Sequence, residues 1–221
     1  MQLNRRDVLR HLTIGAMALQ TIPGLFAQVL TETARMGEGP FYPDKLPLDT
    51  DNDLLVITNS ITPAVGEITH VSGRLLSDSG EPVRNALIEI WQVDNRGSYI
   101  HKDGENTGGR DSHFQGYGRF LTDSRGQYYF RTIKPVAYTL QGQFRAPHIH
   151  FIVARNGRRV LTTQMMVKGH EANSRDFVLA ATKDRSSLDT ILVDFKAMAG
   201  STIGELTANF DIVLGRSPQV P

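Results

Sequence analysis

The chain is organised around the stretch Phe144-Arg145-Ala146-Pro147-His148-Ile149-His150-Phe151-Ile152-Val153. Its aromatic and β-branched residues, entered through a proline, are typical of a β-strand. Because side chains alternate between the two faces of a strand, His148 and His150 would share one face, with Ile149 and Phe151 on the other. Two imidazoles side by side indicate a metal site. A half-buried strand with two histidines on its polar face gives the same pattern.

Length and composition restrict the class of protein. The 221 residues are enough for one domain with a sizeable core, and 40% hydrophobic with 21% charged residues is ordinary for a globular protein. A formal net charge of +1 gives no electrostatic indication of nucleic acid or an anionic membrane as partner. The sequence contains no cysteine, which excludes disulfides, zinc–thiolate sites, iron–sulfur clusters and thiol nucleophiles.

Residues 1–34 differ from the rest of the chain and are predicted to be an export leader. The basic start Asn4-Arg5-Arg6-Asp7-Val8-Leu9-Arg10 precedes a mildly apolar run, and its paired arginines indicate the twin-arginine route. We therefore expect the twin-arginine translocase as a partner and a periplasmic or extracellular location. An amphipathic N-terminal helix belonging to the fold is the alternative. The leader holds three basic and two acidic residues, so the predicted catalytic domain, 35–221, keeps 21 of each.

From about residue 67 onward, short runs of β-branched and aromatic residues alternate with turn residues. The predicted strands are 68–76, 86–93, 119–122, 127–133, 144–153, 160–167 and 208–214. Strands 119–122 and 127–133 would form a hairpin. Helices are expected only in the leader, at 174–181 and at 187–192. This pattern predicts an all-β fold, an antiparallel β-sandwich with few short helices. The long polar connection 99–118 indicates an active-site loop.

Four segments taken together resemble the intradiol ring-cleavage dioxygenases, and most of all the protocatechuate 3,4-dioxygenase branch. They are WQVDNRGSYIH (91–101), FQGYGRFLTD (114–123), GQYYFRTIKPVAY (126–138) and RAPHIHF (145–151). The match runs in order over roughly residues 37–170. Several linked segments that match in order are a much more specific sign of one family than an isolated His-x-His motif.

This resemblance implies a mononuclear, non-haem Fe(III) ion held by Tyr99, Tyr138, His148 and His150. The chemistry of the residues agrees with that ligand set. A phenol has a pKa of about 10, so tyrosine binds a metal only where a strongly charged ion displaces its proton. Two phenolates and one hydroxide would balance the charge of Fe(III), and hard anionic oxygens favour ferric iron. No acidic residue lies between Tyr138 and Arg155, which argues against a ferrous histidine–carboxylate site.

The resemblance also implies the reaction and the residues that assist it. The substrates would be a catechol-type aromatic diol and O2, with the ring opened between the two hydroxylated carbons to a cis,cis-muconate-type diacid. Tyr138 would leave the metal and act as a base. Arg145 would stabilise developing negative charge, and Gln164 would help to orient Arg145. Thr139 stands where proline is usual, and the connection from Tyr138 to Arg145 is short, so the substrate wall differs from the family pattern.

Two other functions remain open at this point. A transthyretin-like or carboxypeptidase-regulatory-like β-sandwich would be a non-enzymatic binding module, in which the four predicted ligands need not meet. A zinc or copper site would use only His148 and His150. Tyr117 is the main rival of Tyr99 as a ligand, and His101 and His113 could line the pocket. The sequence leaves the oligomeric state open, homo-oligomers included.

Overall fold

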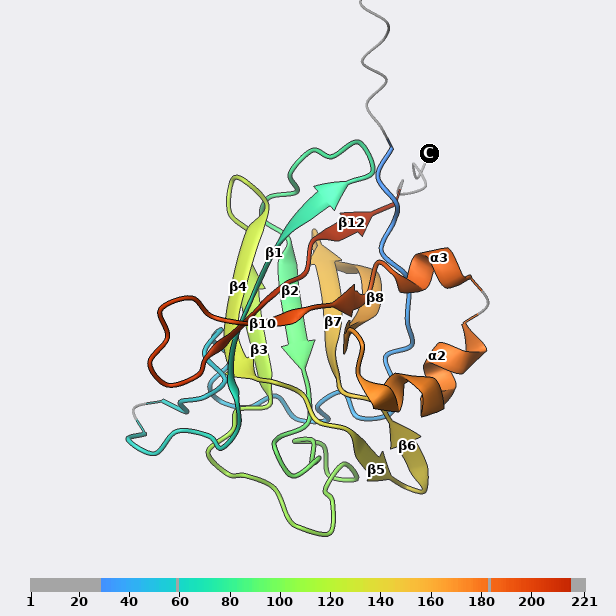
Figure 1. The fold of residues 1–221 in the computed structure, drawn as a ribbon. Helices are drawn as coiled ribbons and strands as arrows, with labels where there is room; N and C mark the ends of the chain where they lie inside the picture. The colour runs from blue at the N-terminus through green and yellow to red at the C-terminus, as the bar shows by residue number, and fades with distance from the viewer. Residues whose placement is uncertain (1–28, 59, 183, 216–221) are drawn as a thin grey trace, which may run out of the picture.

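A computed structural model describes residues 29–58, 60–182 and 184–215 of the chain. Its main body consists of two five-stranded sheets packed face to face, with a separate two-stranded hairpin at one end (Figure 1). The predicted all-β sandwich with few short helices is therefore confirmed. Residues 1–28, which contain most of the predicted leader, lie outside the described residues.

The first sheet is built on β1 (Ile68–Ser77). β4 (Gln127–Ile133) pairs with β1 in antiparallel orientation, whereas β11 (Leu206–Asn209) and β12 (Ile212–Leu214) run parallel to it. β10 (Phe195–Ala197) extends the sheet beyond β11. Most strand pairs of the structure are antiparallel, as predicted, but the parallel pairs with β1 make this sheet mixed. The chain returns to β1 only after passing through the second sheet and the helices, and this long connection permits parallel pairing.

The second sheet has the strand order β3-β2-β7-β8-β9. Its members are β2 (Leu87–Trp91), β3 (Tyr117–Leu121), β7 (His148–Arg155), β8 (Arg158–Val167) and β9 (Leu192–Val193). The pairs within it are antiparallel except β8 with β9. The strand with the two histidines, β7, lies at the centre of this sheet, so its backbone is fixed on both sides.

The predicted hairpin between 119–122 and 127–133 was wrong. The turn forms as expected, with the Gly126 N–H bonded to the Asp123 carbonyl at 3.0 Å. The flanking strands, however, pair elsewhere: β3 with β2 and β4 with β1. The turn therefore carries the chain from one sheet to the other. Local turn chemistry determines that the chain reverses, whereas burial of the side chains determines which strands pair.

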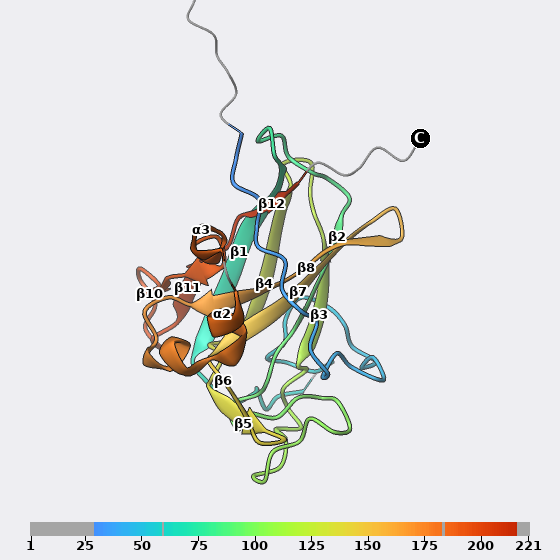
Figure 2. The ribbon, with the colours of Figure 1, turned by 90° about the vertical axis from the view of Figure 1, so that its right-hand side faces the viewer.

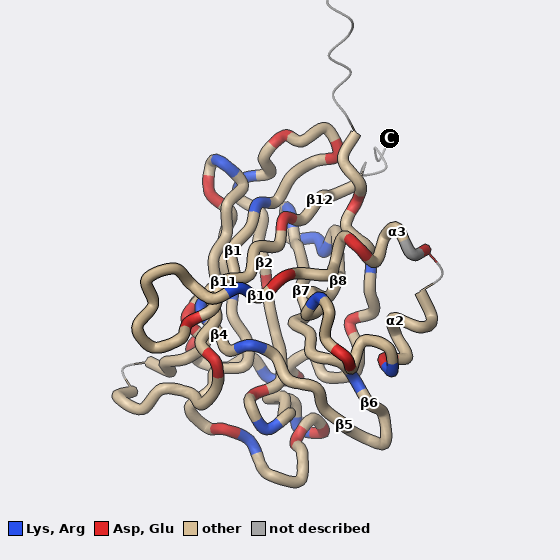
Figure 3. The backbone as a smooth tube through the Cα atoms, viewed as in Figure 1, with Lys and Arg blue, Asp and Glu red and all other residues tan. Residues whose placement is uncertain are grey.

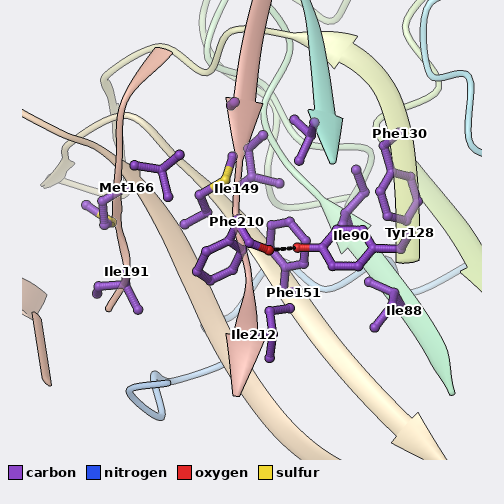
Figure 4. Packing of buried hydrophobic residues seen from close by; sticks show 14 of the residues in the cluster. Ile88, Ile90, Tyr128, Phe130, Ile149, Phe151, Met166, Ile191, Phe210 and Ile212 are labelled. Carbon is purple, nitrogen blue, oxygen red and sulfur yellow. Dashed lines mark hydrogen bonds between the residues drawn. The ribbon is translucent and has the colours of Figure 1, made fainter. Parts of the chain in front are cut away.

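The core lies between the two sheets and follows strand alternation. Figure 4 shows Ile90 of β2 and Phe151 of β7 facing Tyr128 and Phe130 of β4, all of which are buried. The Tyr128 hydroxyl donates to the Phe210 carbonyl, drawn as the dashed line in Figure 4. The predicted last strand, 208–214, is interrupted at residues 210–211, so that β11 and β12 are separate.

The hairpin and the long loops lie at one end of the sandwich, and the helices lie along its side next to β8 (Figure 1). The hairpin consists of β5 (Tyr138–Leu140) and β6 (Gln143–Arg145), and it lies beside the 92–116 segment in both ribbon views (Figures 1 and 2). The helical region comprises η1 (Glu171–Arg175), α2 (Phe177–Ala181) and α3 (Arg185–Leu188). The first predicted helix is thus divided at Asp176, and the second begins and ends earlier than expected.

Residues 29–36 lie along the domain in extended conformation. Leu30 and Thr33 donate backbone hydrogen bonds to Asp78 and Val213, and the buried Ala34 accepts one from the Thr163 hydroxyl. The last part of the predicted leader therefore packs on the sandwich.

Figure 3 shows acidic and basic residues interspersed over the described chain. Among the described residues, none of the helices has the length and apolar character needed to cross a membrane.

Candidate metal centre

β7 presents His148 and His150 on one face, as strand alternation requires. Ile149 and Phe151 point the other way and belong to the core between the sheets. Trp91, opposite His150 in the register with β2, stacks on the His150 ring with centroids 4.5 Å apart and planes 9° apart. Both imidazoles are buried, so β7 is covered on both faces.

The segment 92–116 covers the histidine face and supplies Tyr99. Its start is organised by Asp94, whose carboxylate accepts backbone hydrogen bonds from Arg96 and Ser98 at 2.8 and 3.0 Å. The other carboxylate oxygen accepts from the Asp111 N–H at 2.6 Å and so ties the far part of the loop to its beginning. Tyr99 follows this turn, and its ring is buried.

Tyr138 begins β5 and packs against the same turn. Gly97 has φ +78°, and a Cβ atom at that position would lie 2.9 Å from the Tyr138 Cβ. Glycine is therefore required here both for its backbone conformation and for the close approach of Tyr138.

We expect Gly97→Ala to destabilise the protein and to displace Tyr138. The left-handed conformation alone costs an L-residue about 1–2 kcal/mol. The matched control is Gly157→Ala, since Gly157 has φ +73° with no atom within 4 Å of the added Cβ. Chemical denaturation should show a larger loss for Gly97→Ala than for the control. Equal losses would mean that the contact with Tyr138 is relieved without consequence.

Four side chains meet at the Tyr99 hydroxyl. Tyr99 Oη lies 2.9 Å from Tyr138 Oη, 3.1 Å from His150 Nε2 and 3.4 Å from His148 Nε2. The two Nε2 atoms are 3.1 Å apart. The structure thus brings together, from three separate segments, all four residues that the sequence interpretation named as metal ligands.

Burial determines the charge states within this cluster. Burial, with the nearby Arg145 charge, lowers the pKa of His148 to about 3. Burial, His148 and Arg145 lower the pKa of His150 well below its ordinary value, so both imidazoles are neutral at neutral pH. Burial raises the pKa of Tyr99 and of Tyr138, so in the absence of a cation both phenols keep their protons.

The donor set fits a hard, highly charged metal ion. His148 Nδ1 lies 2.6 Å from the Ala146 carbonyl, so it is this nitrogen that carries the proton while Nε2 offers its lone pair. His150 Nδ1 has no hydrogen-bond partner within the described part of the chain. Among the described residues, no group of three or more His, Cys, Asp or Glu side chains is placed to hold a metal. A metal in this cluster would therefore need the phenol oxygens of Tyr99 and Tyr138.

Arg145 lies at the end of β6, buried next to the cluster. Its NH2 group donates to Gln164 Oε1 at 2.7 Å, and its Nε donates to Asp176 Oδ2 at 2.9 Å. Gln164 in turn donates from Nε2 to the Gly37 carbonyl at 2.9 Å. The guanidinium of Arg145 is thus held between β8, the helical region and the N-terminal segment.

Asp176 is a site residue that the sequence interpretation missed. Its side chain is fully buried, and besides Arg145 it accepts hydrogen bonds from the Ala146 N–H at 2.8 Å and from the Val178 and Leu179 N–H groups at 3.0 Å each. It therefore caps α2 and fixes Arg145 with one carboxylate. The available signal was an aspartate directly before the apolar run of α2, which is an N-cap pattern.

A cavity of about 260 Å³ opens beside the cluster. It is bounded by the N-terminal segment, the β5–β6 hairpin, α2 and the metal-ligand candidates. Its lining residues are Gly37, Gly39, Pro40, Phe41, Tyr138, Leu140, Gln141, Gln143, Arg145, His150, Gln164, Phe177 and Val178. The sequence interpretation did not identify Phe41 or Phe177 as part of the site.

The other residues considered for the site, Tyr117, His101 and His113, lie outside the four-residue cluster. Tyr117 is buried away from the four-residue cluster, and its hydroxyl donates to Glu89 Oε1 at 2.6 Å. His101 and His113 are not among the residues that line the cavity. His101 makes an edge contact with the Phe41 ring, with centroids 5.9 Å apart. Tyr99, rather than Tyr117, is therefore the phenol supplied by this loop.

Comparisons with known proteins identify the family of the chain. A family model described as "Dioxygenase" matches residues 37–216. The chain is also 35% identical over 192 residues to the protocatechuate 3,4-dioxygenase beta chain of Burkholderia cepacia. The aligned region covers 84% of this chain and 80% of that relative. The chain belongs to the intradiol ring-cleavage dioxygenase family.

Other members of the intradiol family show the same relationship. Catechol 1,2-dioxygenase 2 of Acinetobacter lwoffii is 32% identical over 166 residues, or 69% of this chain and 57% of that protein. The solved dioxygenase domain of a carbohydrate-binding fusion protein from Streptomyces sp. SirexAA-E is 26% identical, with a TM-score of 0.61 over 85% of this chain and 100% of that one. Catechol 1,2-dioxygenase from Acinetobacter sp. ADP1 shares the fold, with a TM-score of 0.65 and 23% identity over 96% of this chain and 68% of that one. Family membership favours an intradiol ring-cleavage enzyme over the non-enzymatic binding module.

Proposed function

We propose that this protein is an Fe(III)-dependent intradiol dioxygenase that cleaves a catechol-type diol with O2 between its two hydroxylated carbons, giving a cis,cis-muconate-type diacid. The observation that carries the proposal is the meeting of two phenol oxygens and two imidazole nitrogens at Tyr99 Oη. Tyr99, Tyr138, His148 and His150 would hold the metal. When bound, ferric iron would draw electron density from a coordinated diol and make its ring reactive toward O2.

Tyr138 is the candidate base. Tyr138 and His150 line the cavity, whereas Tyr99 and His148 are not among its lining residues. A diol in the cavity therefore reaches Tyr138 Oη. With the metal bound Tyr138 would be a phenolate, and we assign to this phenolate oxygen the acceptance of a proton from one diol hydroxyl, which leaves Tyr138 as a neutral phenol.

Arg145 supplies the fixed positive charge of the cavity. Its guanidinium is held by Gln164 and Asp176, so it keeps its position as charge develops on the substrate. Negative charge that develops on the ring next to Arg145 would be stabilised without reorganisation of the protein. The buried, largely apolar surroundings limit water and strengthen this interaction.

A visible absorption spectrum of the purified protein tests the metal assignment. We expect a broad tyrosinate-to-iron band that shifts to longer wavelength when catechol is added without O2, and a muconate-type product when O2 is admitted. A protein that contains zinc or copper in place of iron and lacks the tyrosinate-to-iron band would overturn the ferric assignment.

Tyr138→Phe tests the role of the cavity-facing phenol. The variant keeps the ring but loses the oxygen, so the visible band should change, and kcat should fall by about 10²–10⁴-fold if Tyr138 is the base. Tyr117→Phe is the matched control, because Tyr117 is also buried but donates to Glu89 outside the cluster. An unchanged band in Tyr138→Phe would remove Tyr138 from the ligand set.

We also propose that the protein is exported through the twin-arginine route, on the strength of Arg5 and Arg6 within the basic N-terminal segment. Cell fractionation tests this. The full chain should be found in the periplasmic or extracellular fraction, and Arg5→Lys/Arg6→Lys should leave it in the cytoplasm. Export of the double variant at the normal level would contradict this route.

A further inference from the structure

The charge balance of the cavity restricts the substrate. This inference rests on the proposed function, in which the diol oxygens lie at the end of the cavity formed by Tyr138 and His150. Ring substituents remote from the diol then face the remaining lining residues. Arg145 is the one residue with a permanent positive charge among the described residues that line the cavity.

In the proposed function the charge of Arg145 acts on the ring carbons beside it, but two of its nitrogens are already engaged by protein groups. Its Nε is paired with the fully buried carboxylate of Asp176 at 2.9 Å, and its NH2 group is bonded to Gln164. The Phe177 ring lies against the guanidinium, with the Arg145 Cζ 5.5 Å from the ring centroid. A substrate carboxylate would have to compete with Asp176 for the same cation, within a buried environment.

The outer wall of the cavity offers no second cation among the described residues. The β5–β6 hairpin contributes Leu140, Gln141 and Gln143, and α2 contributes Phe177 and Val178. No charged residue occurs from 136 to 144, and Figure 3 shows the tip of this hairpin without charged residues. The wall is therefore apolar with two neutral amide side chains, which can accommodate an uncharged substituent but cannot neutralise an anionic one.

We propose that the substrates of this enzyme are single-ring catechols with no carboxylate on the ring, carrying hydrogen or a small uncharged substituent. A cavity of about 260 Å³ is slightly smaller than the usual range for small-molecule sites, which suits a single ring. The relative from Burkholderia cepacia is named for protocatechuate, a ring carboxylate. The substrate of this chain would therefore be uncharged at the position where the compound that names this relative carries a carboxylate.

The test compares diols that differ chiefly in the charge of the ring substituent. Protocatechuate and its methyl ester have the same diol and a similar electron-withdrawing carbonyl group, but only the acid is anionic at neutral pH. We expect kcat/KM for the ester and for 4-methylcatechol to exceed that for protocatechuate by about 100-fold or more. Anaerobic titration of the visible band should give the same order of affinities. Equal or greater kcat/KM for protocatechuate would overturn the inference.

A variant of the hairpin tests where the substituent lies. Gln143 is exposed at the start of β6 and lines the cavity, so an arginine at this position adds a cation with little demand on the fold. Gln143→Arg should raise the ratio of kcat/KM for protocatechuate to that for the ester by about tenfold. Gln143→Met is the matched uncharged control and should not raise it. An unchanged ratio in Gln143→Arg would overturn the assignment of this wall.

The outcomes also separate this inference from the proposed function. If neither catechol nor the ester is cleaved and no visible band is present, the proposed function itself fails. If all three diols are cleaved with similar kcat/KM, the dioxygenase assignment stands and only the restriction on substrate charge fails.

Discussion

The double substitution His148→Ala/His150→Ala is expected to remove bound iron, the visible band and ring cleavage together. Both side chains are buried, and their Nε2 atoms lie 3.1 Å apart beside Tyr99 Oη. Loss of an outer partner of a metal ligand costs roughly 10–100-fold in affinity or activity, and loss of two direct ligands must exceed that. We therefore expect activity to fall by on the order of 10³-fold or more, measured with catechol alongside the iron content.

The control for this experiment is His113→Ala. The His113 side chain is 46% exposed and lies outside the residues that line the cavity, so its removal should leave the iron content unchanged. Thermal unfolding of the apo forms distinguishes loss of the metal from loss of the fold. A double variant that remains folded and keeps iron and colour would rule out the assigned centre.

The second large effect is expected at Asp176, whose replacement should reduce both stability and turnover. Asp176→Ala leaves the buried Arg145 charge without its partner and removes the cap of α2. Breaking a buried ion pair by removing one member costs about 3–5 kcal/mol in the free energy of unfolding. Because Arg145 also loses its anchor, kcat should fall by about 10–100-fold, comparable to the loss of an outer partner of a metal ligand.

The matched control is Asp184→Ala. Asp184 is likewise an N-cap, accepting a hydrogen bond from the Ser186 N–H at 3.0 Å, but it is exposed. Its loss should cost only about 1 kcal/mol and should leave kcat unchanged. If Asp176→Ala and Asp184→Ala have the same stability and the same kcat, Asp176 is a helix cap and nothing more.

The pH dependence provides an independent measure of the Asp176 contribution. Burial alone would raise the pKa of Asp176, but the Arg145 charge and the backbone N–H groups of Ala146 and Leu179 lower it below its ordinary value. A carboxyl group with a lowered pKa in the folded state stabilises the protein above its unfolded pKa of about 4, and this stabilisation is lost as pH falls through the folded-state pKa. Acid unfolding below about pH 4 should therefore be less steep in Asp176→Asn than in the wild type.

Several features of the fold and the site followed from the sequence alone. The alternation in 148–153 placed both histidines on one face, and the turn residues marked most strand ends. Tyr99, Tyr138, Arg145 and Gln164 were identified through the resemblance of linked segments to one family. These features depend on period and spacing along the chain, which a single sequence contains.

What the sequence did not show were the pairings between distant segments. The turn at 123–126 predicted a hairpin, yet β3 and β4 joined opposite sheets, because burying the inward side chains of each strand outweighed local pairing. The parallel pairing of β11 and β12 with β1 depends on where the chain returns after the helices, and no local pattern records that.

Asp176 illustrates the same limit within the site. Its sequence position indicates a helix cap, but its partnership with Arg145 spans 31 residues and exists only because the β5–β6 hairpin and α2 lie side by side (Figure 1). The sequence by itself determined the strand pattern and the chemical types of the candidate ligands, since these follow from residue order. Only the tertiary structure decided which charged groups pair with one another and which residues line the cavity. These contacts form between segments that are distant along the chain and come together when the chain buries its apolar side chains.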